Sequence, residues 1–229
     1  MKILAIETAS PPGSIALLDG VQVIQTRTLE DPRKTTQHFA TIIENLLQDA
    51  DWSPSSLQLV AAHTGPGSFT GLRIGITAAK VFSYAINAKV VGINTLETLA
   101  YQCFRDTTST HEVETVIDAQ RNQLFAARYR WINGSLETIL PAEIIDADTW
   151  LSERTSNVEL TGPGLKRISE KLSPDCAIAS QPIPQATKLG QLAFLKAQEG
   201  LTTAPMQLAP IYFRKSAAEE KAELQSKQS

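Results

Sequence analysis

The sequence predicts an α/β protein built in two lobes, and three observations support this fold class. The chain opens with short strand-like segments and then alternates helical and strand patterns up to about residue 105, as sheets with helical crossovers do. A polar stretch at 106–112 interrupts the pattern, and strands restart beyond it. A chain of 229 residues is long enough for one to two domains of roughly 150 residues.

We place the first lobe at 1–107 and the second at 108–215, followed by a polar tail at 216–229 that is expected to be disordered. Whether the last helix packs back on the first lobe stays open. The chain opens with strands at 2–8, 14–18 and 21–29, where Asp19-Gly20 is a strong hairpin signal.

The rest of the first lobe alternates as helix 35–50, strand 57–62, helix 72–87, strand 90–93 and helix 95–105. The first of these helices has apolar residues at helical spacing. Its start is placed at Thr35 or Thr36, because an earlier start would put Arg33 and Lys34 in the first turn, where the helix dipole disfavours cations. The second lobe is predicted to contain strands at 115–118, 123–130, 136–140 and 158–160, and helices at 148–154, up to 172, and at 185–200.

Composition limits the classes of function. With 21 basic and 24 acidic residues the net charge is −3 and the pI is near 5.7, so the chain has no overall positive field for collecting nucleic acid. Cys103 and Cys176 lie far apart in the sequence, so we expect two reduced thiols rather than a disulfide framework or a zinc site. No apolar run is long enough for a signal sequence or a membrane span, so a cytoplasmic protein is expected.

A glycine-rich segment, Gly65–Gly71, lies between a predicted strand and a predicted helix. Backbone N–H groups in this setting can hold an anion, which makes Gly65, Gly67 and Ser68 candidate contacts for an anion or nucleotide. The segment matches neither a P-loop, a dinucleotide fingerprint nor a nucleophile elbow. On spacing alone, the alternative that the glycines allow a tight turn and close packing stays equally open.

The helix that follows is nearly free of charge, since Lys80 is the one charged residue between Ile74 and Ile86. A helix that is apolar nearly all round is buried on more than one side. Gly71, Gly75 and Ala79 recur every four residues and are expected to form a face that another helix can approach closely. We expect the sheet to cover one side and a partner subunit the other; coverage by the second lobe is the alternative.

Catalytic signals are weak. The three histidines are isolated, so no metal site is expected. Glu7 and Asp118 end predicted strands on either side of a possible cleft, where a magnesium-dependent phosphotransferase would need carboxylates. A peptidase has the least support, because no arrangement of nucleophile and histidine is evident.

Five segments together resemble the TsaB (YeaZ) family, the non-catalytic subunit of the bacterial machinery for tRNA threonylcarbamoyladenosine. They are ILAIETAS at 3–10, GPGSFTGLRIG at 65–75, GINTLE at 92–97, IDA at 117–119 and PIYFR at 210–214. The resemblance implies the actin/hexokinase/Hsp70-like (ribonuclease H-like) fold, with a mixed sheet in each lobe. It also implies that this chain alone has no catalytic residue and binds no cofactor, ATP and metal being held by partner subunits.

The same resemblance implies the partners. A TsaD-like catalytic subunit would bind the helices at 35–50 and 72–87, and a TsaE-like ATPase would dock where the two subunits meet. The chain alone would form a homodimer. It would contact tRNA only through the complex, and no membrane partner is expected. The expected interface residues are His38, Ile42, Gly71, Gly75, Ala79 and Phe82. Glu7 and Gln120 stand where many relatives have aspartate and arginine. The alternative function is a small phosphotransferase or nucleotide hydrolase of the same fold that uses ATP and magnesium.

Overall fold

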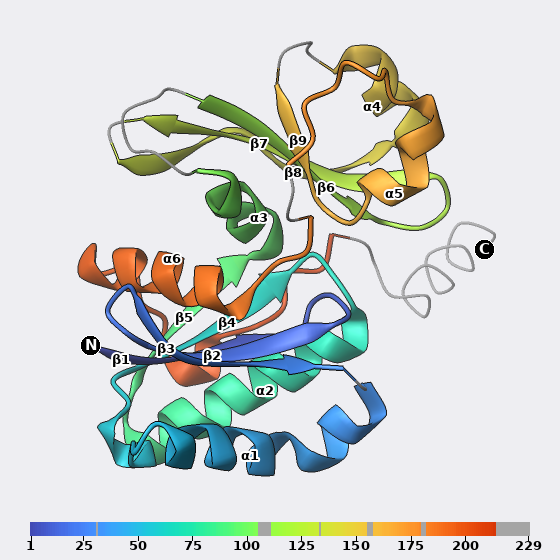
Figure 1. Cartoon of the computed structure of the whole chain (residues 1–229). Helices are drawn as coiled ribbons and strands as arrows, with labels where there is room; N and C mark the ends of the chain where they lie inside the picture. Colours follow the sequence, from blue (N-terminus) through green and yellow to red (C-terminus); the bar gives the residue numbers. More distant parts are fainter. Residues whose placement is uncertain (31, 105–110, 133, 155–157, 180–181, 214–229) are drawn as a thin grey trace, which may run out of the picture.

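The computed structural model describes residues 1–30, 32–104, 111–132, 134–154, 158–179 and 182–213. Two lobes lie one above the other (Figure 1), each built on a mixed sheet. The first sheet has the strand order β3-β2-β1-β4-β5 and the second the order β8-β7-β6-β9. The strands of the first lobe are β1 (Lys2–Glu7), β2 (Gly13–Asp19), β3 (Gln22–Leu29), β4 (Leu59–Gly65) and β5 (Lys89–Asn94).

The connections explain the strand directions of the first sheet. β1, β2 and β3 form an antiparallel meander, with Ile3 opposite Leu18. β4 and β5 run parallel to β1, because helices connect these strands and a crossover returns the chain to the same end of the sheet. The carboxyl ends of β1, β4 and β5 therefore meet at one edge of the sheet, facing the second lobe (Figure 1).

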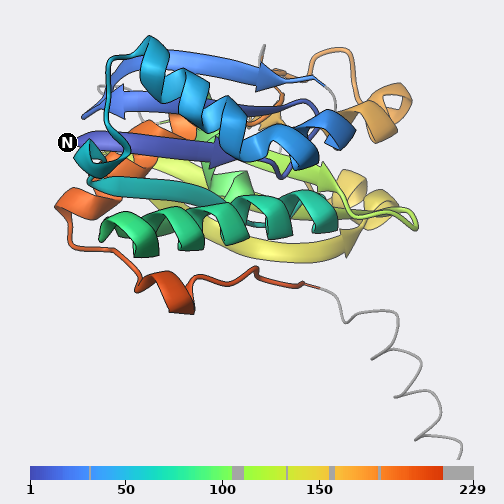
Figure 2. The same ribbon diagram turned by 90° about the horizontal axis from the view of Figure 1, so that it is seen from below.

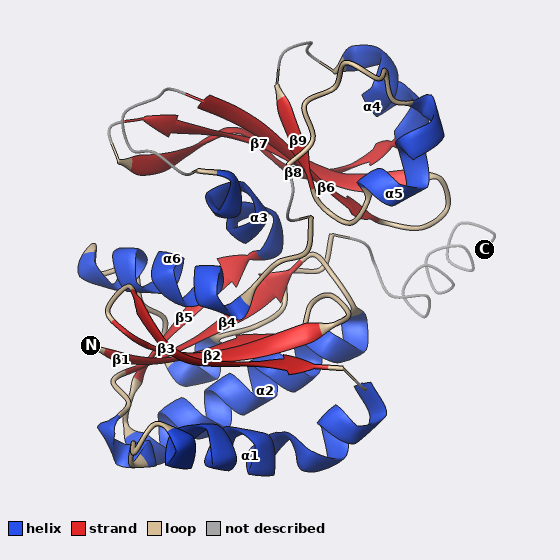
Figure 3. Ribbon diagram, in the orientation of Figure 1, coloured by secondary structure: helices blue, strands red, loops and turns tan. Residues whose placement is uncertain are grey.

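Helices cover both faces of this sheet (Figure 3). α1 (Pro32–Asp49) and α2 (Phe69–Ile86) cover one face, and α6 (Ala186–Gln198) covers the other. Alternate residues of β1 supply the two cores, since Leu4 and Ile6 face α1 and α2 whereas Ile3 and Ala5 face α6. α3 (Thr95–Cys103) lies between α6 and the second sheet.

Two helix starts differ from the prediction. α1 begins at Pro32 rather than Thr35 or Thr36, because proline at the first helical position already has the required backbone angle, which outweighs the cost of the cations that follow. α2 begins at Phe69 rather than Leu72, because Ser68 caps it and its side chain accepts a hydrogen bond from the Gly71 N–H.

The second lobe contains β6 (His111–Asp118), β7 (Gln123–Ile132), β8 (Ser135–Asp146), β9 (Glu159–Thr161), α4 (Ala147–Glu153) and α5 (Leu165–Ile168). β8 runs well past the predicted end at Leu140. It continues through Pro141 because it is an edge strand whose register shifts around Arg128 of β7, and edge strands with bulges tolerate proline. Short 3₁₀ turns lie at η1 (Pro54–Ser56), η2 (Ser169–Lys171) and η3 (Pro205–Gln207).

After α6 the chain returns along α2, as Figure 2 shows. We call residues 203–213 the C-terminal strap. The Thr203 N–H donates to Val90 O at 2.8 Å and the Ile211 N–H to Thr64 O at 2.7 Å, while Leu208 enters the core beneath α2. α6 and the strap up to Ile211 thus pack on the first lobe. The packing of the last helix was left open by the sequence, whereas the strap was predicted to belong to the second lobe.

The predicted tail at 216–229 lies outside the described residues. Among the helices that the structure describes, none combines the length and the apolar character needed to cross a bilayer.

Candidate docking surface

A groove of about 650 Å³ runs between α1 and α2 on the outer side of the first lobe. Its lining consists mainly of apolar and small side chains from the two helices: Phe39, Ala40, Phe69, Thr70, Arg73, Ile74, Thr77, Ala78, Val81 and Phe82. Among these described lining residues Arg73 alone is charged. The groove is therefore an apolar surface with a single cation, and such exposed apolar surfaces commonly mark interaction sites.

Large exposed apolar side chains in and beside the groove make up the rest of this surface. On α2, Phe69, Val81 and Tyr84 are 49%, 60% and 76% exposed. On the C-terminal strap, Ile211 and Tyr212 are each 50% exposed, and the rings of Tyr212 and Phe69 lie 5.5 Å apart. We define the docking surface as the α1/α2 groove, the exposed side of α2 and the adjoining strap residues. Covering these side chains would remove apolar area from water.

The small-residue face of α2 points away from this surface, which corrects the sequence-based interpretation. An ideal Cβ on Gly71 would lie 1.8 Å from Thr8 O, and one on Gly75 would lie 2.4 Å from Thr8 Oγ1. Ala79 is fully buried in the core between α2 and the sheet. Gly71, Gly75 and Ala79 are small because α2 approaches the end of β1 closely, so they are not available to a partner helix.

The other predicted interface residues have different surroundings. Phe82 is half-buried and lines the groove, His38 is exposed on α1, and half-buried Ile42 packs against the core. The strap residues were missed, although the PIYFR segment stood out in the sequence. Its spacing carries no sign that Tyr212 reaches α2, because that contact joins residues 139 positions apart.

The glycine-rich loop is packed between two other segments of the chain. The Ser68 N–H donates to Ala9 O at 2.7 Å, and an ideal Cβ on Gly67 would lie 2.5 Å from the same oxygen. On the other side, a Cβ on Gly65 would lie 3.1 Å from Ile211 O. The Ser68 side chain caps α2. These contacts account for the glycines through close packing; an anion contact at Gly65, Gly67 and Ser68 stays a prediction.

A buried polar cluster lies beneath this loop, at the carboxyl ends of β1 and β4. Glu7 is fully buried, accepts a hydrogen bond from the Ser10 N–H at 3.0 Å, and has its Oε1 3.6 Å from His63 Nδ1. His63 Nε2 lies 2.9 Å from Thr98 Oγ1 on α3. Burial raises the pKa of Glu7, and His63 opposes this shift.

This acid, histidine and hydroxyl follow the order of a catalytic triad, and sequence reasoning missed the arrangement. Thr98 is fully buried, however, so a substrate carbonyl cannot reach its hydroxyl. The cluster therefore ties β1, β4 and α3 together and offers no accessible nucleophile.

Asp118, the other carboxylate proposed from the sequence, is held by local contacts in the second lobe. It accepts a hydrogen bond from the Gln120 N–H at 2.8 Å and forms an ion pair with Arg167 at 3.3 Å. Over the described ranges, no group of three or more His, Cys, Asp or Glu side chains is placed to hold a metal ion.

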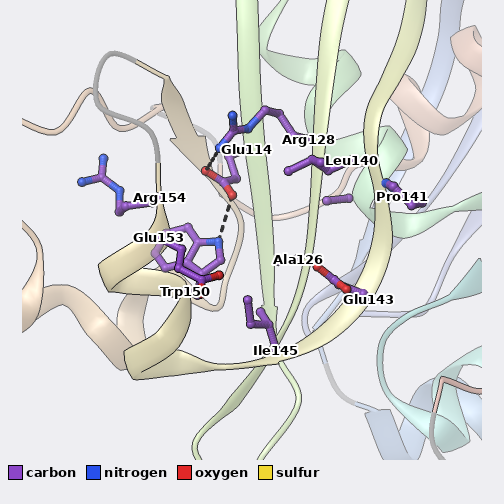
Figure 4. Close-up of a pocket in the computed structure, with 11 residues that line it drawn as sticks. Glu114, Ala126, Arg128, Leu140, Pro141, Glu143, Ile145, Trp150, Glu153 and Arg154 are labelled. Carbon is purple, nitrogen blue, oxygen red and sulfur yellow. Dashed lines mark hydrogen bonds and ion pairs between the residues drawn. The ribbon is translucent and has the colours of Figure 1, made fainter.

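A smaller hollow of about 110 Å³ lies in the second lobe between α4 and β7–β8 (Figure 4). Its buried carboxylate, Glu114, uses both oxygens: the Trp150 indole N–H donates to Oε1 at 3.0 Å, and Arg128 Nη2 donates to Oε2 at 3.3 Å. Glu114 thus links α4 to the second sheet, and both of its oxygens are occupied by these contacts. The docking surface therefore remains the candidate functional site.

The fold and this surface together define a two-lobe α/β protein with an exposed helical face suited to binding another protein. Residues 30–223 match the family described as TsaD, tRNA N6-adenosine threonylcarbamoyltransferase. The chain belongs to this family, as one of its TsaB/YeaZ-type members.

Two named relatives are similar in sequence. The tRNA threonylcarbamoyladenosine biosynthesis protein TsaB of Bacillus subtilis (strain 168) is 31% identical over 154 residues, which cover 66% of this chain and 65% of that protein. TsaB of Escherichia coli (strain K12) is 29% identical over 233 residues, with 96% and 98% covered. The aligned part thus spans just under two thirds of the first relative and nearly all of the second.

Solved structures agree on the fold. YeaZ from Pseudomonas aeruginosa superposes with a TM-score of 0.80 at 22% identity, covering 92% of this chain and 99% of that one. The prediction of an α/β protein with a mixed sheet in each of two lobes is confirmed.

Proposed function

We propose that this chain is a non-catalytic subunit of the machinery that makes threonylcarbamoyladenosine in tRNA, and that its docking surface binds a TsaD-like catalytic subunit. The observation that carries the proposal is the exposed apolar face of α2 beside the groove, with Val81 and Tyr84 at 60% and 76% exposure. Family membership and the names of the relatives supply the process.

The burial of the polar groups that could act in catalysis supports a non-catalytic role for this chain. Glu7 and Thr98 are fully buried, and Ser68 is engaged in capping α2. A phosphotransferase, the alternative drawn from the sequence, would need Glu7 to reach a bound magnesium nucleotide, and its burial argues against this.

The remaining members of the complex belong to the same proposal. A TsaE-like ATPase would bind where this chain and the TsaD-like subunit meet, and ATP and metal would be held by those partners. The net charge of −3 gives this chain little attraction for tRNA phosphates, so tRNA would contact the partner.

Val81→Arg tests the surface, because the change places a long cation in the middle of an apolar contact. We expect affinity for the purified TsaD-like subunit, measured by surface plasmon resonance, to fall by roughly 10- to 100-fold, as for a central interface residue. The matched control is Val23→Arg on β3, an exposed valine outside the docking surface, which should bind like the wild type. Unchanged binding of Val81→Arg would place the interface elsewhere.

A further inference from the structure

We infer that Arg73 receives a carboxylate of the docked protein, and that Tyr212 of the C-terminal strap holds Arg73 in position to do so. This inference rests on the proposed function and identifies the chemistry of the partner's contacting face. It begins from a cluster of three side chains at the amino-terminal end of α2. We call Phe69, Arg73 and Tyr212 the Arg73 cluster.

The cluster fixes the arginine without neutralising it. The guanidinium carbon of Arg73 lies 3.8 Å from the centre of the Phe69 ring, and its Nε donates to the Tyr212 hydroxyl at 3.2 Å. Both contacts leave the charge in place. Arg73 is exposed, and within the described part of the chain it has no carboxylate partner. Because a guanidinium has five N–H donors in a planar fork, its terminal nitrogens can still receive a carboxylate.

Tyr212 is itself held on both sides by well-packed neighbours. The Ile211 N–H bonds to Thr64 O at 2.7 Å, and Phe213 packs its ring 5.5 Å from that of Phe125 in the second lobe. Leu208, earlier in the strap, is 2% exposed in the core. A free arginine side chain loses conformational entropy when it is immobilised, and an arginine that is already held loses less on binding. Tyr212 is therefore a positioning residue.

The charges around the Arg73 cluster argue for a partner that presents carboxylates. α2 contains two basic residues, Arg73 and Lys80, and no acidic residue, so its own helix offers Arg73 no carboxylate. Among the described residues that line the groove, Arg73 alone is charged. A protein with carboxylates beside an apolar helix face therefore complements this surface, and the TsaD-like subunit of the proposed function is the occupant to which we commit.

Binding kinetics at low and high salt test the inference, with the full chain and the purified TsaD-like subunit. Arg73→Gln should weaken binding roughly tenfold at low salt and flatten the salt dependence of the association rate, because surface ion pairs are screened by salt. Lys166→Gln, which removes one positive charge from the second lobe, is the control and should change neither. Tyr212→Phe keeps the ring but loses the hydroxyl. It should weaken binding at low salt and match the wild type at high salt, whereas a general structural defect would weaken binding at every salt concentration.

Two outcomes would overturn the inference. If Val81→Arg abolishes binding while Arg73→Gln leaves both affinity and salt dependence unchanged, the docking surface stands and the role of Arg73 fails. If Arg73→Gln weakens self-association of the isolated chain, measured by light scattering, while binding to the TsaD-like subunit stays unchanged, a second copy is the occupant of the Arg73 cluster and the inference fails.

Discussion

Replacing Gly75 with alanine tests which way the small-residue face of α2 points. In the structure this face lies against the end of β1, where an ideal Cβ on Gly75 would stand 2.4 Å from Thr8 Oγ1 and 3.5 Å from Ile6 Cγ2. Real atoms do not approach as closely as the first of these distances, so the Thr8 side chain must move. Its hydroxyl donates to Gly71 O at 2.7 Å, and that hydrogen bond would be strained or lost.

The expected loss of stability follows from three contributions. Overpacking a well-filled site costs about 1–3 kcal/mol, and losing the threonine hydrogen bond costs about 1 kcal/mol. Alanine offsets about 1 kcal/mol of this because it favours the helix more than glycine does. The free energy of unfolding should therefore fall by about 1–3 kcal/mol, as measured by urea denaturation.

A second substitution identifies the cause of this loss. Thr8→Ala removes the atom that Gly75→Ala would strike, so the double variant should lose less stability than the two single variants together. The folded fraction of Gly75→Ala should bind the TsaD-like subunit with wild-type affinity. Full stability combined with lost binding would refute the reasoning, because it would mean that Gly75 faces a partner.

Two further predictions concern buried carboxylates. Burial raises the pKa of Glu7 above its ordinary value of 4.5, so the folded state binds this proton more tightly than the unfolded state, and the resulting stability is lost as pH rises from 4.5 through the native pKa. Glu7→Gln should remove this part of the decline, so urea unfolding between pH 4.5 and neutrality should show a flatter slope than the wild type; parallel slopes would contradict the assignment. Trp150→Phe should lower the free energy of unfolding by about 1–3 kcal/mol, because Glu114 loses one of its buried donors; a change under about 0.5 kcal/mol would show that the indole N–H matters little.

The elements of the first lobe could be predicted because their signals are local. Asp19-Gly20 closes the hairpin between β2 and β3, and the apolar spacing of α1 appears within a few turns of sequence. The helix starts were less predictable, since they depend on competition between neighbouring effects. Proline at position 32 outweighs the unfavourable cations. Ser68 caps α2, whereas the position of its loop between a strand and a helix had also made it a candidate anion contact.

The groups that decide function were less predictable because they are assembled from distant segments. Glu7, His63 and Thr98 come from two strands and a helix, and no spacing in the sequence relates them. The Arg73 cluster depends on where the strap runs after α6. The strap is held beside α2 by the buried side chain of Leu208 and by the backbone hydrogen bonds of Thr203 and Ile211.

The case of α2 shows what helix composition determines and what it leaves open. A helix that is apolar nearly all round must be covered on more than one side, and here the sheet covers one side while the other keeps large side chains in water. Small residues on a helix mark where a neighbouring segment approaches the helix backbone closely. For α2 this segment is the end of β1, where the Thr8 hydroxyl donates to Gly71 O. Partner contact is instead indicated by large apolar residues that remain exposed after the chain has folded, as Val81 and Tyr84 do. In α2 the face with the smallest side chains packs on the protein's own sheet. The face with the largest exposed side chains is the one on which the proposed partner would remove most apolar area from water.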